Sequence, residues 1–129
     1  MPEHPNAAVL RQVHAALTGG DLSRLMELIE EDAVRHFPGR GPFAGDYRRD
    51  EFVDVARRMW ELSGGTINVE LHDTVASDEH AVNLERITAT RNGKRLDIQL
   101  AVVCHVRDGK LTEAWDLFSD TQAWDEFWS

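Results

Sequence analysis

The repeat of apolar residues changes partway along the chain, and this change constrains the fold more than any other feature. Up to about residue 62, apolar residues recur at the spacing of amphipathic helices, whereas from residue 66 they alternate with polar residues as in half-buried strands. Asn92-Gly93 and Asp108-Gly109 interrupt the alternating half, and such pairs are the strongest short signal for a hairpin turn. The second half therefore predicts an antiparallel meander with strands over residues 66–75, 80–91, 94–106 and 110–118.

The first half predicts three helices ahead of this meander. Their apolar faces cover residues 6–18, 21–30 and 50–62. Gly19-Gly20 ends the first helix, and Asp21 and Asp50 are suitable N-cap residues for the other two. A short extended piece is expected over residues 33–37, and a last short helix begins at Asp120. Helices followed by a meander make an α+β layout.

The length and charge of the chain limit what it can be and bind. With 129 residues and no internal repeat or linker, the sequence predicts a single domain over residues 1–129. The net charge of −9 argues against a nucleic-acid partner, which requires a basic face. No apolar run approaches the roughly 20 residues of a membrane span, and the N-terminus lacks the pattern of a signal peptide. Cys104 is the single cysteine and is expected to be an inert buried thiol. Because one cysteine cannot form an intrachain disulfide, the reducing cytoplasm is the expected location. No membrane partner is expected.

The two hairpins also predict which side chains share a face of the sheet, because the turn length sets the register. With two residues in each turn, Arg86 is opposite Gln99, and Asp116 on the last strand falls on the same face. Thr88 is then opposite Asp97. This face is largely apolar, with a few ionisable groups near its centre, which is typical of a ligand pocket.

The opposite face is expected to be apolar over the last two strands only. Its apolar residues there are Leu96, Ile98, Leu100, Val102, Cys104, Val106, Trp115 and Leu117, of which Ile98, Leu100, Val102, Trp115 and Leu117 are expected to form an exposed patch. A patch of this kind is larger than most monomers expose to water. We therefore expect a homodimer formed through the outer face of the sheet.

Several sequence segments together are similar to a known family. They are Gly20-Asp21-Leu22, Glu31-Asp32-Ala33-Val34, His36-Phe37-Pro38-Gly39, Phe43-Ala44-Gly45-Asp46-Tyr47 and the run from Asp108 to Asp116. The chain resembles the SnoaL-like and ketosteroid-isomerase-like branch of the nuclear-transport-factor-2-like superfamily. The resemblance implies a cone-shaped α+β barrel in which three N-terminal helices pack on a strongly curved, mainly antiparallel sheet of four to six strands. It also implies a homodimer.

The same resemblance implies candidate catalytic residues. SnoaL-type cyclases place an acidic base on the last strand, and Asp116 matches it. Relatives of limonene-epoxide hydrolase use an Arg and an Asp two residues apart on one strand, together with an Asp on the last strand. Arg86 and Asp116 match two of these three groups, and Thr88 stands in the place of the third. Asp97, expected opposite Thr88, could supply the missing carboxylate, and His36 lies near the position where those relatives hold a water molecule.

Each candidate also has a purely structural interpretation. In an apolar pocket Asp116 would act as a base with a raised pKa, and Arg86 would stabilise a developing oxyanion, but the two could equally form a structural ion pair. His36 could act as a general acid or position water, or it could only cap the turn at Pro38-Gly39. The side chains expected to contact a ligand are Phe37, Tyr47, Trp60, Leu71, Leu84, Thr88, Asp97, Gln99, Val103 and Phe118. The aromatic ones could equally belong to the core.

Two classes of function follow from these expectations. The first is an enzyme that performs cofactor-free acid–base chemistry, of the cyclase, isomerase or epoxide-hydrolase type, on a small hydrophobic molecule. The second is a binding domain that encloses such a molecule without reaction.

Residues 34–38 contain no carboxylate, although ketosteroid isomerases place their base there. His80 and His105 are expected to face each other, but two histidines are too few for a metal site. The glycine-containing loop over residues 38–47 is expected to form the rim of the pocket.

Overall fold

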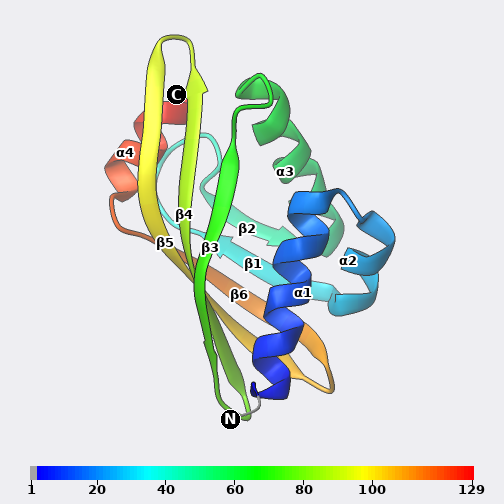
Figure 1. Ribbon diagram of the computed structural model, residues 1–129. Coiled ribbons are helices and arrows are strands. Elements are labelled where there is room, and N and C mark those ends of the chain that lie inside the picture. Colours follow the sequence, from blue (N-terminus) through cyan, green and yellow to red (C-terminus); the bar gives the residue numbers. More distant parts are fainter. Residues whose placement is uncertain (1–2) are drawn as a thin grey trace.

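The computed structural model describes residues 3–129 and contains four helices and six strands (Figure 1). The helices are α1 (Pro5–Gly19), α2 (Leu22–Leu28), α3 (Arg49–Leu62) and α4 (Thr121–Trp128). The strands are β1 (Ile29–Phe37), β2 (Gly45–Arg48), β3 (Asn68–Ala76), β4 (His80–Arg91), β5 (Lys94–Arg107) and β6 (Lys110–Phe118). Within residues 3–129, no helix is both long and apolar enough to cross a membrane.

All six strands belong to one curved, open sheet in the order β2-β1-β6-β5-β4-β3. Neighbouring strands are antiparallel, except that β1 and β6 run parallel. Helices α1, α2 and α3 lie together over one face of the sheet, and α4 lies beside the β4–β5 hairpin (Figure 1). We call the face under these helices the inner face and the opposite one the outer face. The core lies between the inner face and the helices, where Leu25, Leu96 and Trp124 are at most 2% exposed.

The sequence predicts the α+β class correctly but misplaces part of the framework. Three helices do not precede the sheet, because β1 and β2 separate α2 from α3. The helix expected over residues 21–30 ends at Leu28, and the chain continues as β1 because pairing with β2 and β6 satisfies its backbone groups. The sheet has six strands rather than the four of the meander, and it is open at β2 and β3 rather than closed into a barrel.

The two predicted hairpin turns are confirmed. Asn92 and Asp108 have φ angles of 51° and 52°, and the glycine after each has a φ of 77°. Two consecutive residues with positive φ define the turn type that matches the twist of a hairpin. As expected, Arg86 pairs with Gln99 and Thr88 pairs with Asp97.

A bulge in β6 breaks the predicted register between β5 and β6. Glu113, rather than Thr112, is opposite His105, so β6 carries one extra residue at this point. Because side chains alternate between faces, one extra residue moves every later side chain of β6 to the other face relative to β5. Asp116 is consequently opposite Val102.

The inner face of β5 is its uniformly apolar side. The buried residues on that side are Leu96, Ile98, Leu100, Val102, Cys104 and Val106. The helices cover this side because burying it removes the largest apolar area from water. The face of β4 and β5 that the sequence analysis assigned to the pocket is therefore the outer face, and the prediction that Arg86, Gln99 and Asp116 share one face is wrong.

Candidate functional site

A cavity of about 810 Å³ lies between the inner face of the sheet and helices α1 and α3. Its walls are mainly aliphatic and aromatic, and they include Leu10, Val13, Phe52, Met59, Ile87 and Leu100. Arg35, Glu85 and Asp116 add three ionisable side chains from three different strands. An apolar cavity with a few convergent polar groups is typical of a small-molecule site.

A buried ion pair joins β1 to β6 in the wall of this cavity. Arg35 donates from Nε to Asp116 Oδ1 at 2.7 Å and from Nη2 to Asp116 Oδ2 at 2.9 Å. The Asp116 side chain is 2% exposed and the Arg35 side chain is 18% exposed. The parallel pairing of β1 with β6 brings the two residues together. Such a two-bond fork fixes both planar groups in one orientation.

Aromatic rings surround the charge of Arg35. Its guanidinium carbon lies 4.2 Å from the ring centre of Phe52 and 5.4 Å from that of Phe37, within the range of cation–π contacts. Burial acts to lower the pKa of Arg35, but the attraction of Asp116 outweighs it and the pKa is raised. Arg35 therefore remains a cation inside the cavity wall.

Glu85 is a carboxyl group in the same wall without a strong counter-ion of its own. It lies on the inner face of β4 and is 8% exposed. Burial raises its pKa to about 7; Arg35 opposes this rise, the negative charge of Asp116 adds to it, and a hydrogen bond with the Asn83 side chain opposes it to a smaller extent. Because its pKa lies near neutrality, Glu85 can both accept and donate a proton at physiological pH.

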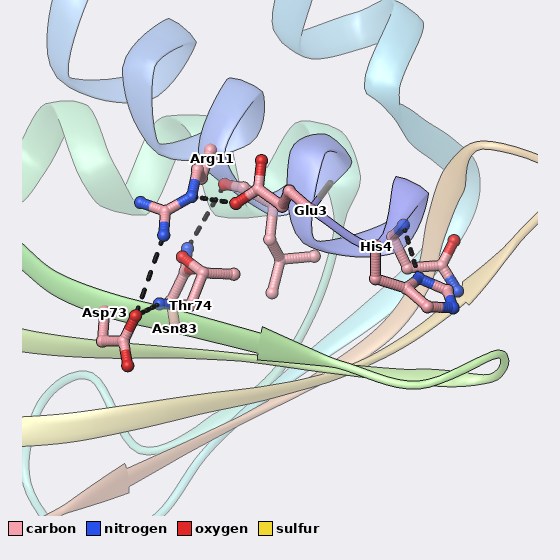
Figure 2. A network of polar contacts seen from close by, with 8 residues as sticks. Glu3, His4, Arg11, Asp73, Thr74 and Asn83 are labelled. Atoms are coloured by element: carbon pink, nitrogen blue, oxygen red, sulfur yellow. Dashed lines mark hydrogen bonds and ion pairs between the residues drawn. The ribbon is translucent and has the colours of Figure 1, made fainter. Parts of the chain in front are cut away.

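Polar groups at the middle of α1 fix that helix to the sheet. The Thr74 hydroxyl donates to Asn83 Oδ1 at 2.7 Å, and Asn83 Nδ2 donates to the backbone carbonyl of Leu10 at 3.3 Å. Figure 2 shows Arg11 of α1 above this pair, reaching both Glu3 and Asp73. Asn83 lines the cavity, but its side-chain oxygen and nitrogen are both engaged in this support.

The cavity opens between the α1–α2 turn and the C-terminal part of α3. Leu22 and Trp60 line the cavity and are still 46% and 56% exposed, which places them at the mouth. The loop over residues 38–47 does not line it, so the prediction of a rim there is wrong. Gly39 and Gly41 instead pack on α4, where an added Cβ would lie 2.5 Å and 2.8 Å from Asp125 Oδ1. This contact holds the loop against α4.

The structure brings only some of the predicted site residues to the cavity. Those that line it are Phe37, Trp60, Asp116 and Phe118. Leu71 is half-buried on the inner side of β3 without lining the cavity, and Tyr47 packs on the edge of Phe37 while its hydroxyl donates to the Phe43 carbonyl. The residues on the outer face are Leu84, Arg86, Thr88, Asp97, Gln99 and Val103.

Arg86 has a different partner from the one predicted. It donates from Nε and Nη2 to the two carboxylate oxygens of Asp97, at 2.8 Å and 2.7 Å. Both side chains are exposed to solvent, at 50% and 36%. This pair has the same two-bond geometry as Arg35 with Asp116, but it lies on the solvent-exposed outer face of the sheet.

His36 also lies on the outer face, away from the cavity. Its ring stacks on Trp115 at a centroid distance of 5.3 Å, and its two nitrogens lie 2.7 Å from carboxylate oxygens of Asp46 and Glu113. The hydrogen bonds to Glu113 and Asp46 raise the pKa of His36. His80 and His105 face each other nearby as predicted, and within residues 3–129 no group of three or more potential ligands is arranged to hold a metal ion.

The placement of His36 gives a pH-dependent stability. Its raised pKa means that the ion pairs with Glu113 and Asp46 stabilise the fold fully below the unfolded pKa of 6.5, and that this contribution is lost as the pH rises through the folded-state pKa. We expect His36→Gln to be more destabilising at pH 5.5 than at pH 8.5 in urea titrations. His72→Gln, at an exposed histidine on β3 for which no ion pair is found within residues 3–129, is the matched control. An equal cost of His36→Gln at both pH values would contradict the interpretation.

Comparison with known proteins places the fold among described relatives. Residues 10–114 match the family described as SnoaL-like domain. Bal32a, from a soil-derived mobile gene cassette, is 36% identical, with 97% of each chain covered and a TM-score of 0.92. The uncharacterised protein Rv0034 of Mycobacterium tuberculosis is 28% identical over 100% of both chains. IdmH of Streptomyces antibioticus, described as a candidate polyketide cyclase, is 22% identical over 90% of this chain and 93% of its own, with a TM-score of 0.75 that shows a shared fold.

Proposed function

Because the chain belongs to the SnoaL-like family, we propose that it is an enzyme that performs cofactor-free acid–base chemistry on a small hydrophobic molecule held in the cavity. The observation that carries this proposal is Glu85, a buried carboxyl group whose pKa is raised to about 7 within a largely apolar wall. A group that titrates near the working pH is the most effective general acid or base. The description of IdmH as a candidate polyketide cyclase is consistent with this class of reaction.

Glu85 and Arg35 would divide the chemistry between them. Glu85 takes a proton from a carbon or hydroxyl of the substrate, or returns one to it, and the apolar surroundings strengthen its carboxylate as a base. Arg35 uses Nε and Nη2 to bind Asp116, which leaves the N–H groups of Nη1 for an oxygen of the substrate. A fixed cation beside that oxygen stabilises the negative charge that develops there. Asp116 acts as the positioning residue of Arg35, in place of the base role expected from the sequence.

The charges in the cavity favour an uncharged substrate. Asp116 already balances the charge of Arg35, and an ionised Glu85 would repel an anion. The other arginine of the lining, Arg57, forms an exposed ion pair with Asp54, and the mainly apolar walls present few groups to the phosphate of a nucleotide or to the many hydroxyls of a sugar. We infer a ring system that bears a carbonyl, a hydroxyl or an epoxide, with a cyclase, isomerase or epoxide-hydrolase type of reaction.

A ligand screen by thermal shift tests this proposal. Hydrophobic ketones, lactones and epoxides should raise the melting temperature, because a ligand that binds only the folded state stabilises it, whereas nucleotides should not. Each stabilising compound is then incubated with the protein and analysed for conversion. Stabilisation by phosphorylated or strongly anionic compounds alone would contradict the proposed pocket. Binding without conversion of any compound would favour the alternative of a non-catalytic binding domain.

The proposal includes a homodimer formed through the outer face. The residues expected at the interface from the sequence were partly wrong, since Ile98, Leu100 and Val102 face the core. The outer face nonetheless carries exposed apolar side chains, among them Leu84 at 37% and Leu117 at 53% exposure. Such a patch is suited to an isologous contact with a second copy.

Leu117→Asp is expected to abolish the homodimer, because a charge would be buried at the contact. Multi-angle light scattering at micromolar concentration should give a dimer mass for the wild type and a monomer mass for the variant. Leu22→Asp, at an exposed leucine beside the cavity mouth, should remain dimeric. A monomer mass for the wild type would refute the proposed assembly.

A further inference from the structure

His14 is a cavity residue with no part in the proposed chemistry or in the hydrogen bonds of Thr74 and Asn83 that fix α1 to the sheet. It belongs to α1 and lines the cavity together with Leu10, Val13 and Leu17, which lie on the same face of that helix. Its side chain is half-buried. A histidine among these apolar neighbours requires an account of where its two ring nitrogens bond.

The structure fixes the proton of this imidazole. His14 Nε2 lies 3.0 Å from the backbone carbonyl oxygen of Val69 on β3. A carbonyl oxygen can only accept a hydrogen bond, so Nε2 must carry the proton. In the neutral ring, Nδ1 then has a lone pair and no hydrogen. Within residues 3–129, Nδ1 has no hydrogen-bond partner, so an acceptor remains for a molecule in the cavity.

His14 and Glu85 line the same cavity, and the strand register relates their positions along the sheet. Val69, which holds the ring, pairs with Ile87, and Leu71 pairs with Glu85 on the same side of the β3–β4 ladder. Ile87 and Glu85 are two residues apart on β4, which corresponds to about 7 Å along a strand. One small molecule can therefore reach both His14 and the group formed by Glu85, Asp116 and Arg35.

We propose that His14 is a specificity-determining residue of the site, which selects a ligand that presents a hydroxyl or N–H donor to Nδ1. This inference rests on the proposed function, since it concerns the same cavity, and it narrows the class of ligand. Arg35 offers donors and His14 offers an acceptor, so the favoured molecule is an apolar ring that carries both an acceptor oxygen and a donor, such as a hydroxy-ketone. A compound that lacks the donor leaves Nδ1 unpaired in a partly dry site and binds less tightly.

Two matched probes and two variants test the inference. 2-Naphthol has a hydroxyl donor, and 2-methoxynaphthalene has the same ring system without one. Their dissociation constants are measured by isothermal titration calorimetry on the wild type, on His14→Phe and on His14→Gln. His14→Gln keeps an N–H that can reach the Val69 carbonyl, and circular dichroism checks that each variant is folded.

For each protein we take the ratio of the dissociation constant of 2-methoxynaphthalene to that of 2-naphthol. This ratio is expected to be about fivefold larger in the wild type than in His14→Phe, which corresponds to one neutral hydrogen bond. Comparing the ratio between proteins removes the difference in hydrophobicity of the two probes. An unchanged ratio in His14→Phe, with both probes still bound, overturns the role of His14 and leaves the proposed function in place. Failure of both probes to bind the wild type overturns the pocket and this inference together.

A second measurement does not depend on any variant. Long-range proton–nitrogen spectra of the wild type distinguish a ring protonated on Nε2 from one protonated on Nδ1. We expect the His14 signals to show the Nε2–H form, with an Nδ1 resonance that moves on addition of 2-naphthol and does not move with 2-methoxynaphthalene. An Nδ1–H form, or equal shifts with both probes, overturns the inference.

Discussion

Asp116→Ala is expected to lower the free energy of unfolding by about 3 to 5 kcal/mol, because it leaves Arg35 as an unpaired buried cation. The Asp116 carboxylate is 2% exposed and accepts both hydrogen bonds that Arg35 makes. The aromatic rings of Phe37 and Phe52 beside the guanidinium provide only a small part of what the carboxylate supplies. The change is measured by urea titration at pH 7.

The outer face supplies a matched control for this prediction. Asp97 accepts the same two-bond fork from Arg86, with distances of 2.8 Å and 2.7 Å, but both partners are exposed. Asp97→Ala should therefore change the stability little, since solvent replaces the lost partner. The double variant Arg35→Met with Asp116→Leu should recover most of the loss, because apolar side chains of similar volume remove both buried charges. Equal effects of Asp116→Ala and Asp97→Ala would show that burial does not set the strength of the Arg35 pair.

Local signals in the sequence predicted those parts of the fold that depend on neighbouring residues. The turns at Asn92-Gly93 and Asp108-Gly109 form as expected, and Asp21 caps α2 by accepting a hydrogen bond from the backbone N–H of Arg24. The strand β1 was recognised only in part, over residues 33–37 of Ile29–Phe37. Its backbone partners lie in β2 and in the distant β6, and no pattern in a short window can report a pairing of that kind.

The prediction grouped the wrong residues into the candidate site because of one extra residue in β6. A bulge at Thr112 leaves no local mark on the sequence, yet it reverses which side chains of β5 share a face with Asp116. Asp116 does line the cavity, but its predicted partner Arg86 lies on the other side of the sheet. The replacement, Arg35, did have a signal: it alternates with Ala33 and Phe37, and alternation with two buried apolar residues indicates an inward side chain.

Glu85 could have been found in the same way, since it alternates on β4 with the buried Ile87 and Ala89. Its pKa depends on its surroundings in three dimensions, above all on burial, and a sequence cannot supply these. The pKa of about 7 has consequences for both stability and activity.

The effect of Glu85 on stability follows from the direction of its shift. Its pKa rises from 4.5 in the unfolded chain to about 7 in the folded protein, so between these values the folded state holds a proton that the unfolded state has released. The protein should therefore lose stability as the pH rises from 4.5 through 7, by about 3 kcal/mol in total. Glu85→Gln keeps the shape and removes the charge, so it should be more stable than the wild type at pH 8.5 by up to this amount and should not differ at pH 4. Urea titrations across the range measure the difference.

The same substitution, Glu85→Gln, also tests the chemistry: it should lower activity although it raises stability at high pH. Glu85→Gln cannot accept or donate a proton, so conversion of any compound found in the ligand screen should fall by a factor of 100 or more, about the contribution of one general acid–base group. The melting-temperature shift caused by that compound should persist, because the apolar walls and Arg35 are unchanged. Glu70→Gln, at an exposed residue that lies opposite Arg86 in the β3–β4 ladder, should alter neither stability nor conversion. A variant that is stabilised at high pH yet converts the compound at the wild-type rate would show that Glu85 is a buried acid without a catalytic role, and a variant with neither change would show that Glu85 is not the titrating group of the cavity.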